Sequence, residues 1–375
     1  MSVTAAIAAC LGTLLAAGLG ERLLRDRARA AVPIRVHVNG TRGKSTVTRL
    51  IAAALRAHGI PTLARVTGTE ARLLLPDGTE RPVRRLGPPN VREELRFLLL
   101  ARRLGARAAV VECVAISPDL QHAAEREMVG ATMGVVTNVR TDHTEAMGSS
   151  LAEIAASLAA TVPRSGILVL GTPDFVELFR QRAGSLGTRV VVAGPPSGAG
   201  VSWLGEDVAT ALEVTRLVGV PDDVARAAMA SAAEDPGAFR ERVVTVAGRE
   251  IALLDARAAN DPESFALLLR TSTLLSSVTG PVLAIYNHRH DRPDRLRRFS
   301  PSLAALPGAR VLFTGDRPAL GLARSVRRDG RAAFPFVAVG RLRAAVEGSG
   351  ARAVVLCGNS RGLTADAVVG GSPRG

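Results

Sequence analysis

The fold is decided by residues 34–59, IRVHVNGTRGKSTVTRLIAAALRAHG. The first six residues form a β-branched run that predicts a short strand, whereas Val47, Leu50 and Ile51 recur at helical spacing. Between the two elements lies a turn that contains Gly40 and Gly43. A strand, a glycine-rich turn and a helix in this order direct backbone N–H groups and a helix N-terminus toward an anion. The segment therefore predicts a phosphate-binding loop.

Lys44 is the only lysine among 48 basic residues, and it lies in this turn. A compact ammonium can bridge the last phosphates of a nucleotide, and the longer, forked guanidinium of Arg cannot replace it inside a loop. Ser45 or Thr46 would offer a hydroxyl to a magnesium ion. The motif departs from the standard GxxxxGK[ST] loop because Val38 stands where a glycine is expected. A glycine turn can arise by chance, but the lone lysine in it favours nucleotide binding.

Two further candidate ligands follow other predicted strands. Glu112 ends the run AAVVEC (108–113), and TNVRTDH (137–143) brings Asn138, Asp142 and His143 to the end of another. Open α/β sheets bind ligands at the carboxyl ends of parallel strands. Oxygen atoms from Glu112 and Ser45 suit Mg²⁺ that is also held by phosphate, and His143 could hold a second ion. Taken singly, Glu112 could equally be a buried paired carboxylate and His143 a solvated loop residue.

Strands alternate with helices along the whole chain, which predicts an α/β fold with mostly parallel sheets. The first domain would continue through strands at 133–138, 167–171 and 189–194. A second series, at 242–246, 250–256, 281–287, 309–315, 334–339 and 352–358, predicts another α/β domain. We expect three parts: residues 1–30 as a membrane anchor with a basic juxtamembrane segment, 31–237 as the nucleotide-binding domain and 238–375 as the second domain.

The N-terminal segment 2–20 carries no charge and is just long enough to cross a bilayer as a helix. The arginines come after it, from Arg22 to Arg29, so the positive-inside rule places the domains in the cytoplasm. A buried or peripheral helix is the alternative. The net charge of +14 would suit nucleic acid, but the arginines are dispersed and aromatic residues make up only 3%. We therefore expect an anionic substrate or lipid as the partner, and no nucleic acid.

The three cysteines, Cys10, Cys113 and Cys357, lie far apart and lack zinc-ligand spacing. This pattern suits a reducing compartment and excludes a disulfide scaffold.

The stretches NGTRGKST, ECVAISPDL and TNVRTDHTEAMG resemble the ATP-binding domain of the Mur ligase family, the ATP-dependent amide ligases of peptidoglycan and folate polyglutamylation. Together with VTGTEARLLLPDG, EDPGAFR, AANDPES, NHRHDRPDR and CGNSRG, they are most similar to the membrane-anchored poly-γ-glutamate synthase ligase subunits of capsule biosynthesis, the PgsB/CapB type. The resemblance implies a P-loop-type parallel-sheet domain like the Mur ligase central domain, followed by a Rossmann-like α/β ligase domain.

The resemblance also assigns roles. Lys44, Glu112, His143 and Arg240 would be catalytic, with Arg240 reaching the γ-phosphate, and Ser45, Glu112 and His143 would hold metal. The nucleotide would be bound by Asn39, Gly40, Thr41, Arg42, Gly43, Lys44, Ser45, Thr46, Asn138, Asn260 and Asp291, of which Asn260 meets adenine and Asp291 the ribose. Many Mur ligases hold the second metal with a carbamylated lysine, but Leu158 stands near that place here.

The implied reaction is ATP-dependent amide bond formation with Mg²⁺. A terminal glutamate carboxylate of a poly-γ-glutamate chain would be activated as an acyl phosphate, and the amine of the next glutamate would attack it, with release of ADP. Other membrane subunits of a synthase complex would be partners. Only about thirty residues precede the loop, so a UDP-linked substrate, which needs a further domain, is not expected. The alternatives are a folylpolyglutamate-type or other amino-acid ligase, and a membrane-associated P-loop ATPase or switch.

Overall fold

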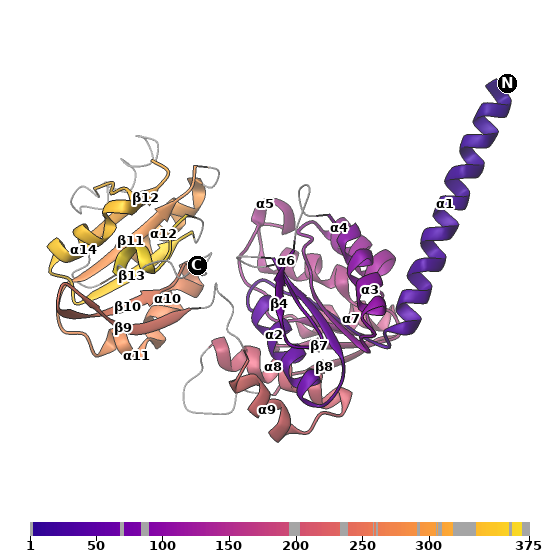
Figure 1. Cartoon of the computed structure of the whole chain (residues 1–375), viewed down its shortest axis with the longest axis horizontal. Coiled ribbons are helices and arrows are strands. Elements are labelled where there is room, and N and C mark those ends of the chain that lie inside the picture. Colours follow the sequence, from indigo (N-terminus) through magenta and orange to yellow (C-terminus); the bar gives the residue numbers. More distant parts are fainter. Residues whose placement is uncertain are drawn as a thin grey trace. The chain divides into compact units, whose positions relative to one another are not determined.

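The computed structural model describes residues 3–67, 71–83, 90–194, 203–232, 239–257, 259, 262–290, 293–304, 306, 310–317, 335–359 and 362–369. The chain forms two compact units, Met1–Asp235 and Pro236–Gly375. Each has its own sheet and its own core (Figure 1). Both are of the mixed α/β class that the alternation of strands and helices predicts.

Unit 1 is built on an eight-stranded sheet in the order β4-β3-β2-β5-β1-β6-β7-β8. Six of these strands are parallel, and β3 and β4 add an antiparallel hairpin at one edge. Strand β1 lies between β5 and β6, so its carboxyl end meets both neighbouring loops. The strands are β1 (Ile34–Asn39), β2 (Thr62–Val66), β3 (Arg72–Leu74), β4 (Glu80–Pro82), β5 (Ala108–Glu112), β6 (Met133–Val136), β7 (Ile167–Leu170) and β8 (Arg189–Val192).

Helices cover both faces of this sheet (Figure 1). Val36 and Val38 of β1 join the core formed with α2, α8 and α9, whereas His37 and Asn39 point to the opposite face, as alternation along a strand requires. The helical elements are α2 (Lys44–Ala57), α3 (Arg92–Arg103), α4 (Pro118–Ala123), the π-helix η1 (Ala124–Val129), α5 (Thr144–Met147), α6 (Leu151–Leu158), the 3₁₀-helix η2 (Ala159–Thr161), α7 (Val176–Gly184), α8 (Trp203–Val218) and α9 (Asp222–Ala230).

Helix α1 (Val3–Ala31) runs without a break from the apolar N-terminal segment into unit 1. Its last turns contribute Ala28 to the core that includes Leu98 of α3. Within the described residues one helix, Ile7–Ala31, is long and apolar enough to cross a membrane by length and composition.

Unit 2 carries a five-stranded sheet in the order β12-β11-β13-β10-β9, in which only β9 is antiparallel. Asn287 and Asn359 join the ends of β11 and β13 through two side-chain hydrogen bonds of 2.6 and 3.0 Å. The elements are β9 (Arg240–Val246), β10 (Arg249–Asp255), α10 (Pro262–Thr271), α11 (Thr273–Ser276), β11 (Val282–His288), α12 (Pro293–Ala304), β12 (Arg310–Gly315), η3 (Val339–Arg341), α14 (Leu342–Ser349), β13 (Ala353–Gly358) and α15 (Asp366–Val369).

One predicted strand is wrong. Residues 334–339 read as a β-branched and aromatic run, but the described part makes only an isolated bridge between Phe336 and Phe313 before η3 begins. Pro335, which has no N–H to donate, precedes the bridge, and this is consistent with the absence of a continuous ladder there. Strand β2 is not among the strands expected from the sequence, although all five of its residues are buried.

Candidate nucleotide and metal site

The loop between β1 and α2 needs both of its glycines. Gly40 and Gly43 have φ angles of 127° and 79°, a region that side chains with a Cβ rarely adopt. A Cβ on Gly40 would lie 2.1 Å from Thr137 Oγ1, and one on Gly43 would lie 2.1 Å from Asp207 Oδ1. The glycines are therefore required by backbone conformation and by close neighbours alike. The result is a tight loop that ends at the N-terminus of α2.

Asn138 holds the middle of this loop. Its Oδ1 accepts hydrogen bonds from Thr41 Oγ1 at 2.7 Å and from the backbone N–H of Arg42 at 3.1 Å. Its Nδ2 donates to the carbonyl of Arg42 at 3.2 Å. The backbone N–H of Arg140 in turn donates to Thr41 Oγ1 at 2.9 Å. The segment after β6 and the loop after β1 are thus joined through one amide side chain.

Lys44 folds back over the loop. Its Nζ donates to the carbonyl of Gly40 at 2.7 Å and to that of Thr41 at 3.4 Å. Both of these hydrogen bonds go to neutral carbonyl oxygens, so neither consumes a counter-charge. Thr46, in the same turn of α2, is partly exposed.

Ser45 and Glu112 meet beneath the loop. Ser45 Oγ donates to Glu112 Oε2 at 2.7 Å, and the backbone N–H of Thr67 donates to the same oxygen at 2.7 Å. Glu112 is 4% exposed and Ser45 8% exposed. A hydroxyl and a carboxylate oxygen side by side at the start of a phosphate loop are the ligand types that Mg²⁺ prefers in proteins.

A second charged group lies at the end of β6. His143 adopts a left-handed backbone with φ of 40°, and its Nδ1 lies 3.2 Å from Glu145 Oε1. Asp142 Oδ1 lies 3.4 Å from a guanidinium nitrogen of Arg42. Burial alone would raise the pKa of Asp142, but the positive charges of Arg42, His143 and Lys44 lower it below its ordinary value. Asp142 is therefore ionised and balances the positive charge of Arg42 and Lys44.

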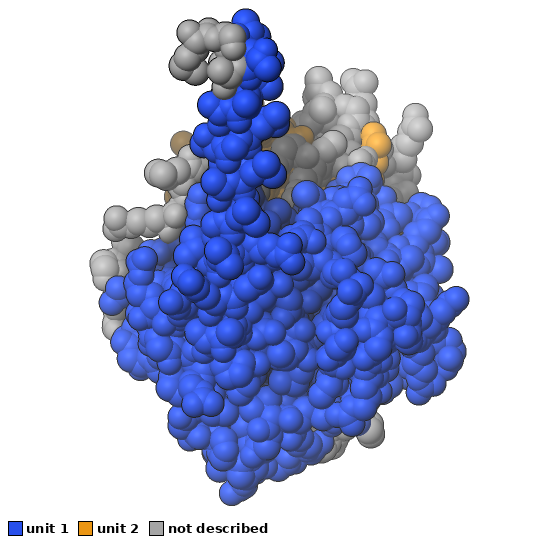
Figure 2. Space-filling view, turned by 90° about the vertical axis from the view of Figure 1, so that its right-hand side faces the viewer, with its two compact units in different colours: residues 1–235 blue, residues 236–375 orange. Residues whose placement is uncertain are grey.

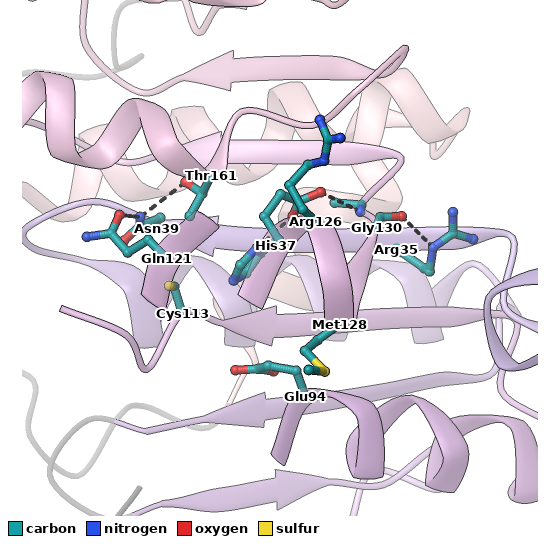
Figure 3. A network of polar contacts seen from close by, with 12 residues as sticks. Arg35, His37, Asn39, Glu94, Cys113, Gln121, Arg126, Met128, Gly130 and Thr161 are labelled. Atoms are coloured by element: carbon teal, nitrogen blue, oxygen red, sulfur yellow. Dashed lines mark hydrogen bonds and ion pairs between the residues drawn. The ribbon is translucent and has the colours of Figure 1, made fainter. Parts of the chain in front are cut away.

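The site is supported from behind by a buried polar network (Figure 3). Asn39 Nδ2 donates to Gln121 Oε1 at 2.8 Å and to Thr161 Oγ1 at 3.1 Å, so its side chain holds β1 to α4 and η2. His37 Nδ1 lies 2.8 Å from Glu125 Oε2 on the π-helix, and both side chains are fully buried. Burial would lower the pKa of His37, but Cys113 and Glu125 raise it well above its ordinary value. Any contact of Asn39 with nucleotide would come from its backbone.

Asp207, on α8, borders the loop although no sequence pattern points to it. Its carboxyl packs against Gly43, it is 3% exposed, and its Oδ2 has no hydrogen-bond partner in the described structure. Burial, with a smaller contribution from Glu206, raises its pKa from 3.8 to about 8, against the opposing effect of Arg140. The surrounding sequence EDVATAL contains no motif that indicates a binding site. Asp207 lies beside Gly43 because α8 packs on the loop between β1 and α2.

Three expected nucleotide contacts belong to unit 2. Arg240 is the first residue of β9 and is exposed, while Asn260 and Asp291 lie outside the described residues. Leu158 is fully buried in the apolar core that includes Phe179. The position near which many Mur ligases carry a carbamylated lysine is thus part of the core here.

The donor set fits a phosphate and a divalent ion together better than an ion alone. Among the described side chains, no group of three His, Cys, Asp or Glu residues is placed to hold a metal by itself. A metal between Ser45 and Glu112 would therefore need phosphate and water oxygens to complete its shell. The loop, Lys44 and Arg42 supply the positive side of such a site.

Comparison with known proteins identifies the family to which both units belong. The profile of the Mur ligase middle domain matches residues 38–222, and that of the poly-gamma-glutamate synthase CapB C-terminal domain matches residues 241–368. PGA synthase CapB of Bacillus subtilis (strain 168) is 33% identical over 321 residues, which cover 83% of this chain and 81% of that protein. Capsule biosynthesis protein CapB of Bacillus anthracis is 33% identical over 305 residues, 78% of this chain and 65% of that protein.

The fold is also shared with solved ligase structures. FolC of E. coli, in complex with DHPP and ADP, matches with a TM-score of 0.64 at 18% identity, over 90% of this chain and 89% of that one. One family profile lies within each of the two compact units. From its sequence and its fold, the chain belongs to the CapB family of poly-gamma-glutamate synthases, built on the Mur ligase fold.

Proposed function

We propose that this chain is an ATP-dependent, ADP-forming amide ligase of poly-γ-glutamate synthesis. It would activate the terminal glutamate carboxylate of the polymer as an acyl phosphate for attack by the amine of the next glutamate. Family membership supports the ligase class and the polymer. One contact gives the main support for the proposed chemistry: Glu112 Oε2 accepts a hydrogen bond from Ser45 Oγ. Ser45 lies in the first turn of α2, the helix that begins with Lys44.

The charges around the loop support phosphoryl transfer. We propose that Lys44 leaves the carbonyls of Gly40 and Thr41 to bind the β- and γ-phosphates, while the backbone of the loop binds the remaining oxygens. Preorganised positive groups stabilise the charge that develops on the transferred group. Thr41, Arg42 and Asn138 would keep the loop in this shape.

Mg²⁺ fits the paired oxygens of Ser45 and Glu112, and it would neutralise the phosphate oxygens when bound. His143 would serve the second ion, with Asp142 ionised beside it. No lysine is available near Leu158, so the second ion would rely on His143, substrate and water.

Arg240 would complete the site from unit 2, and Asn260 and Asp291 would hold the nucleoside. These roles rest on the resemblance of DPGAFR, AANDPES and NHRHDRPDR to the family.

Helix α1 supports a single-pass membrane anchor with the two units on the cytoplasmic side. Its apolar segment precedes the arginines, and its large apolar side chains, such as Leu14 and Leu15, are exposed. Other membrane subunits of a synthase complex would then act beside it. A soluble folylpolyglutamate-type ligase shares the fold but would have no use for this segment.

The test is synthesis itself. Membranes that carry the protein and its genetic neighbours should convert ATP to ADP in a glutamate-dependent reaction with Mg²⁺ and yield a γ-linked polymer. ATP hydrolysis that is indifferent to glutamate would instead support the ATPase or switch. The matched control is Lys44→Met in the same membranes, which should give neither ADP nor polymer.

A further inference from the structure

The last three turns of helix α1 are attached to the rest of unit 1 by specific contacts. Glu21 Oε2 accepts from Arg92 at 2.6 Å, Arg25 donates to the carbonyl of Glu127 at 3.1 Å, and Arg29 donates to the carbonyl of Arg126 at 2.9 Å. Ala28 is fully buried between these contacts. Because the helix has no break between its exposed and docked parts, its direction is fixed relative to unit 1.

The contacts also give this direction. Glu21 meets the start of α3, whereas Ala28, two turns later, joins the core with Leu98 and Ala101 in the middle and end of α3. The two helices therefore run the same way. Helix α3 leads into β5, so its start lies toward the edge of the sheet at which β5 ends, which is the edge that carries Glu112. Residue 21 is thus on the nucleotide-site side of unit 1.

The uncharged segment of α1 begins where the contacts with unit 1 end. Figures 1 and 2 show the N-terminal part of α1 projecting from the rest of unit 1, and in Figure 1 it rises past the side on which α4 and α5 lie. The segment from Val3 to Gly20 would extend about 27 Å at the usual helical rise, against about 30 Å for the hydrocarbon core of a bilayer. The first charges of the helix, Glu21 and Arg22, would then lie at the bilayer surface.

Exposed apolar side chains gather on the same side. Among the described residues of unit 1 outside α1, four large apolar side chains are exposed: Ile116, Leu120, Leu151 and Leu104. Ile116 and Leu120 follow the end of β5, and Leu151 begins α6 after the end of β6. Only Leu104, at the far end of α3, lies at the opposite edge. Ile116, Leu120 and Leu151, which we call the apolar rim, are 39%, 50% and 42% exposed.

We propose that the apolar rim rests on the lipid bilayer in which α1 is anchored, so that the nucleotide-site edge of unit 1 faces the membrane surface. This rests on the proposed anchor, and it goes beyond it, because a flexibly tethered domain could face any direction. Apolar side chains at an interface enter the boundary between headgroups and acyl chains. The growing polymer would then be extended beside the membrane rather than in the bulk cytoplasm.

The test uses the full-length protein in liposomes, with Cys10→Ala to remove the exposed native cysteine; Cys113 and Cys357 are buried. A fluorophore is attached at Leu120→Cys or, in the matched control, at Leu104→Cys, a leucine of similar exposure at the opposite edge. Lipids with a nitroxide on the headgroup should quench the label at position 120 by about twofold or more, since it lies within roughly 10 Å of the interface. The label at position 104 should be nearly unaffected. Leu151→Cys is a second rim reporter in case the first variant folds poorly.

Equal quenching at positions 120 and 104, or stronger quenching at 104, would overturn the proposed orientation. The absence of quenching at both rim positions, 120 and 151, in protein that sediments with the liposomes would overturn it as well. The last result would refute the orientation while the anchor would stand. Protein that does not sediment with liposomes at all would contradict both the anchor and the orientation. Glutamate-dependent ADP formation, measured separately, tests the ligase activity in each case.

Discussion

Ser45 Oγ donates a 2.7 Å hydrogen bond to Glu112 Oε2, so that the first turn of α2 and the end of β5 share one carboxylate oxygen. The two residues are 67 positions apart in the sequence. The parallel pairing of β1 with β5 places their loops side by side and creates this contact.

Glu112→Gln should reduce ADP formation by about 10²-fold or more, because it removes the charge that we expect to hold metal while keeping the side chain's size. The amide oxygen can still accept from Ser45 and from the N–H of Thr67, so the melting temperature should change little. Initial rates across a range of Mg²⁺ concentrations measure the effect. Ser45→Ala should give a smaller loss, and a Glu112→Gln protein with a normal metal requirement would exclude Glu112 as a ligand.

Lys44→Arg should abolish ATP turnover although the charge is retained. Lys44 Nζ lies 2.7 Å from the carbonyl of Gly40, and a forked guanidinium is too large for the space inside the loop. Loss of a group that stabilises the transition state costs about 10²-fold or more in rate. The control is the reverse exchange, Arg56→Lys, in the last turn of the same helix, which should stay active. Near-normal turnover of Lys44→Arg would refute the assignment.

Asp207 should make the stability of the protein depend on pH between about 4 and 8. Its pKa is raised from 3.8 to about 8, so the folded state keeps a proton that the unfolded chain releases across this range. The free energy of unfolding should therefore fall as pH rises from about 4 to about 8, and then level off as far as this group is concerned. Above pH 8 the carboxylate beside Gly43 should also raise the KM for ATP by repelling phosphate.

Asp207→Asn should remove both effects, because the amide has the same shape and does not titrate. Melting temperature and KM for ATP, measured from pH 5 to pH 9, decide the matter, with Asp223→Asn on the exposed surface as the control. If the pH profile of Asp207→Asn matches that of the unchanged protein, the buried carboxyl plays no part in it.

The His37–Glu125 pair should stabilise unit 1. Replacing Glu125 by Gln would leave the buried imidazolium without its counter-charge, and breaking a buried pair in this way costs about 3–5 kcal/mol. Because the pKa of His37 is raised, the stabilisation is complete below its unfolded pKa and is lost as pH rises through the folded pKa. Denaturant unfolding at several pH values tests this. Glu127→Gln, two residues away and largely exposed, should cost far less.

The sequence predicted the parts of the site that lie in local motifs. Glycines at positions 40 and 43, a single lysine and a serine in one turn describe a phosphate loop without knowledge of the fold. Glu112 could be added because strand ends of a parallel sheet meet at one edge. The predicted strands at 34–39 and 108–113 correspond to β1 and β5 within one residue.

Other features depend on packing between distant segments. Asp207 reaches Gly43 only through the position of α8, and Asn39 turns out to hold α4 and η2 with its side chain. The run at 334–339 has the composition of a strand, but forms only one bridge. The contacts of Asp207 and Asn39 and the structure at 334–339 depend on which segments pack together, and the spacing of residues in a single sequence does not reveal this.

The central claim, activation of a carboxylate as an acyl phosphate, is tested most directly by isotope transfer. Glutamate oligomer labelled with oxygen-18 in its carboxylates is incubated with ATP, Mg²⁺, glutamate and membranes that contain the protein and its partner subunits. If an acyl phosphate forms, one labelled oxygen moves to inorganic phosphate as the amide forms, and the nucleotide product is unlabelled ADP. Labelled AMP would show an adenylate intermediate, and unlabelled phosphate with continued ATP hydrolysis would show that no carboxylate is activated; either result would contradict the account.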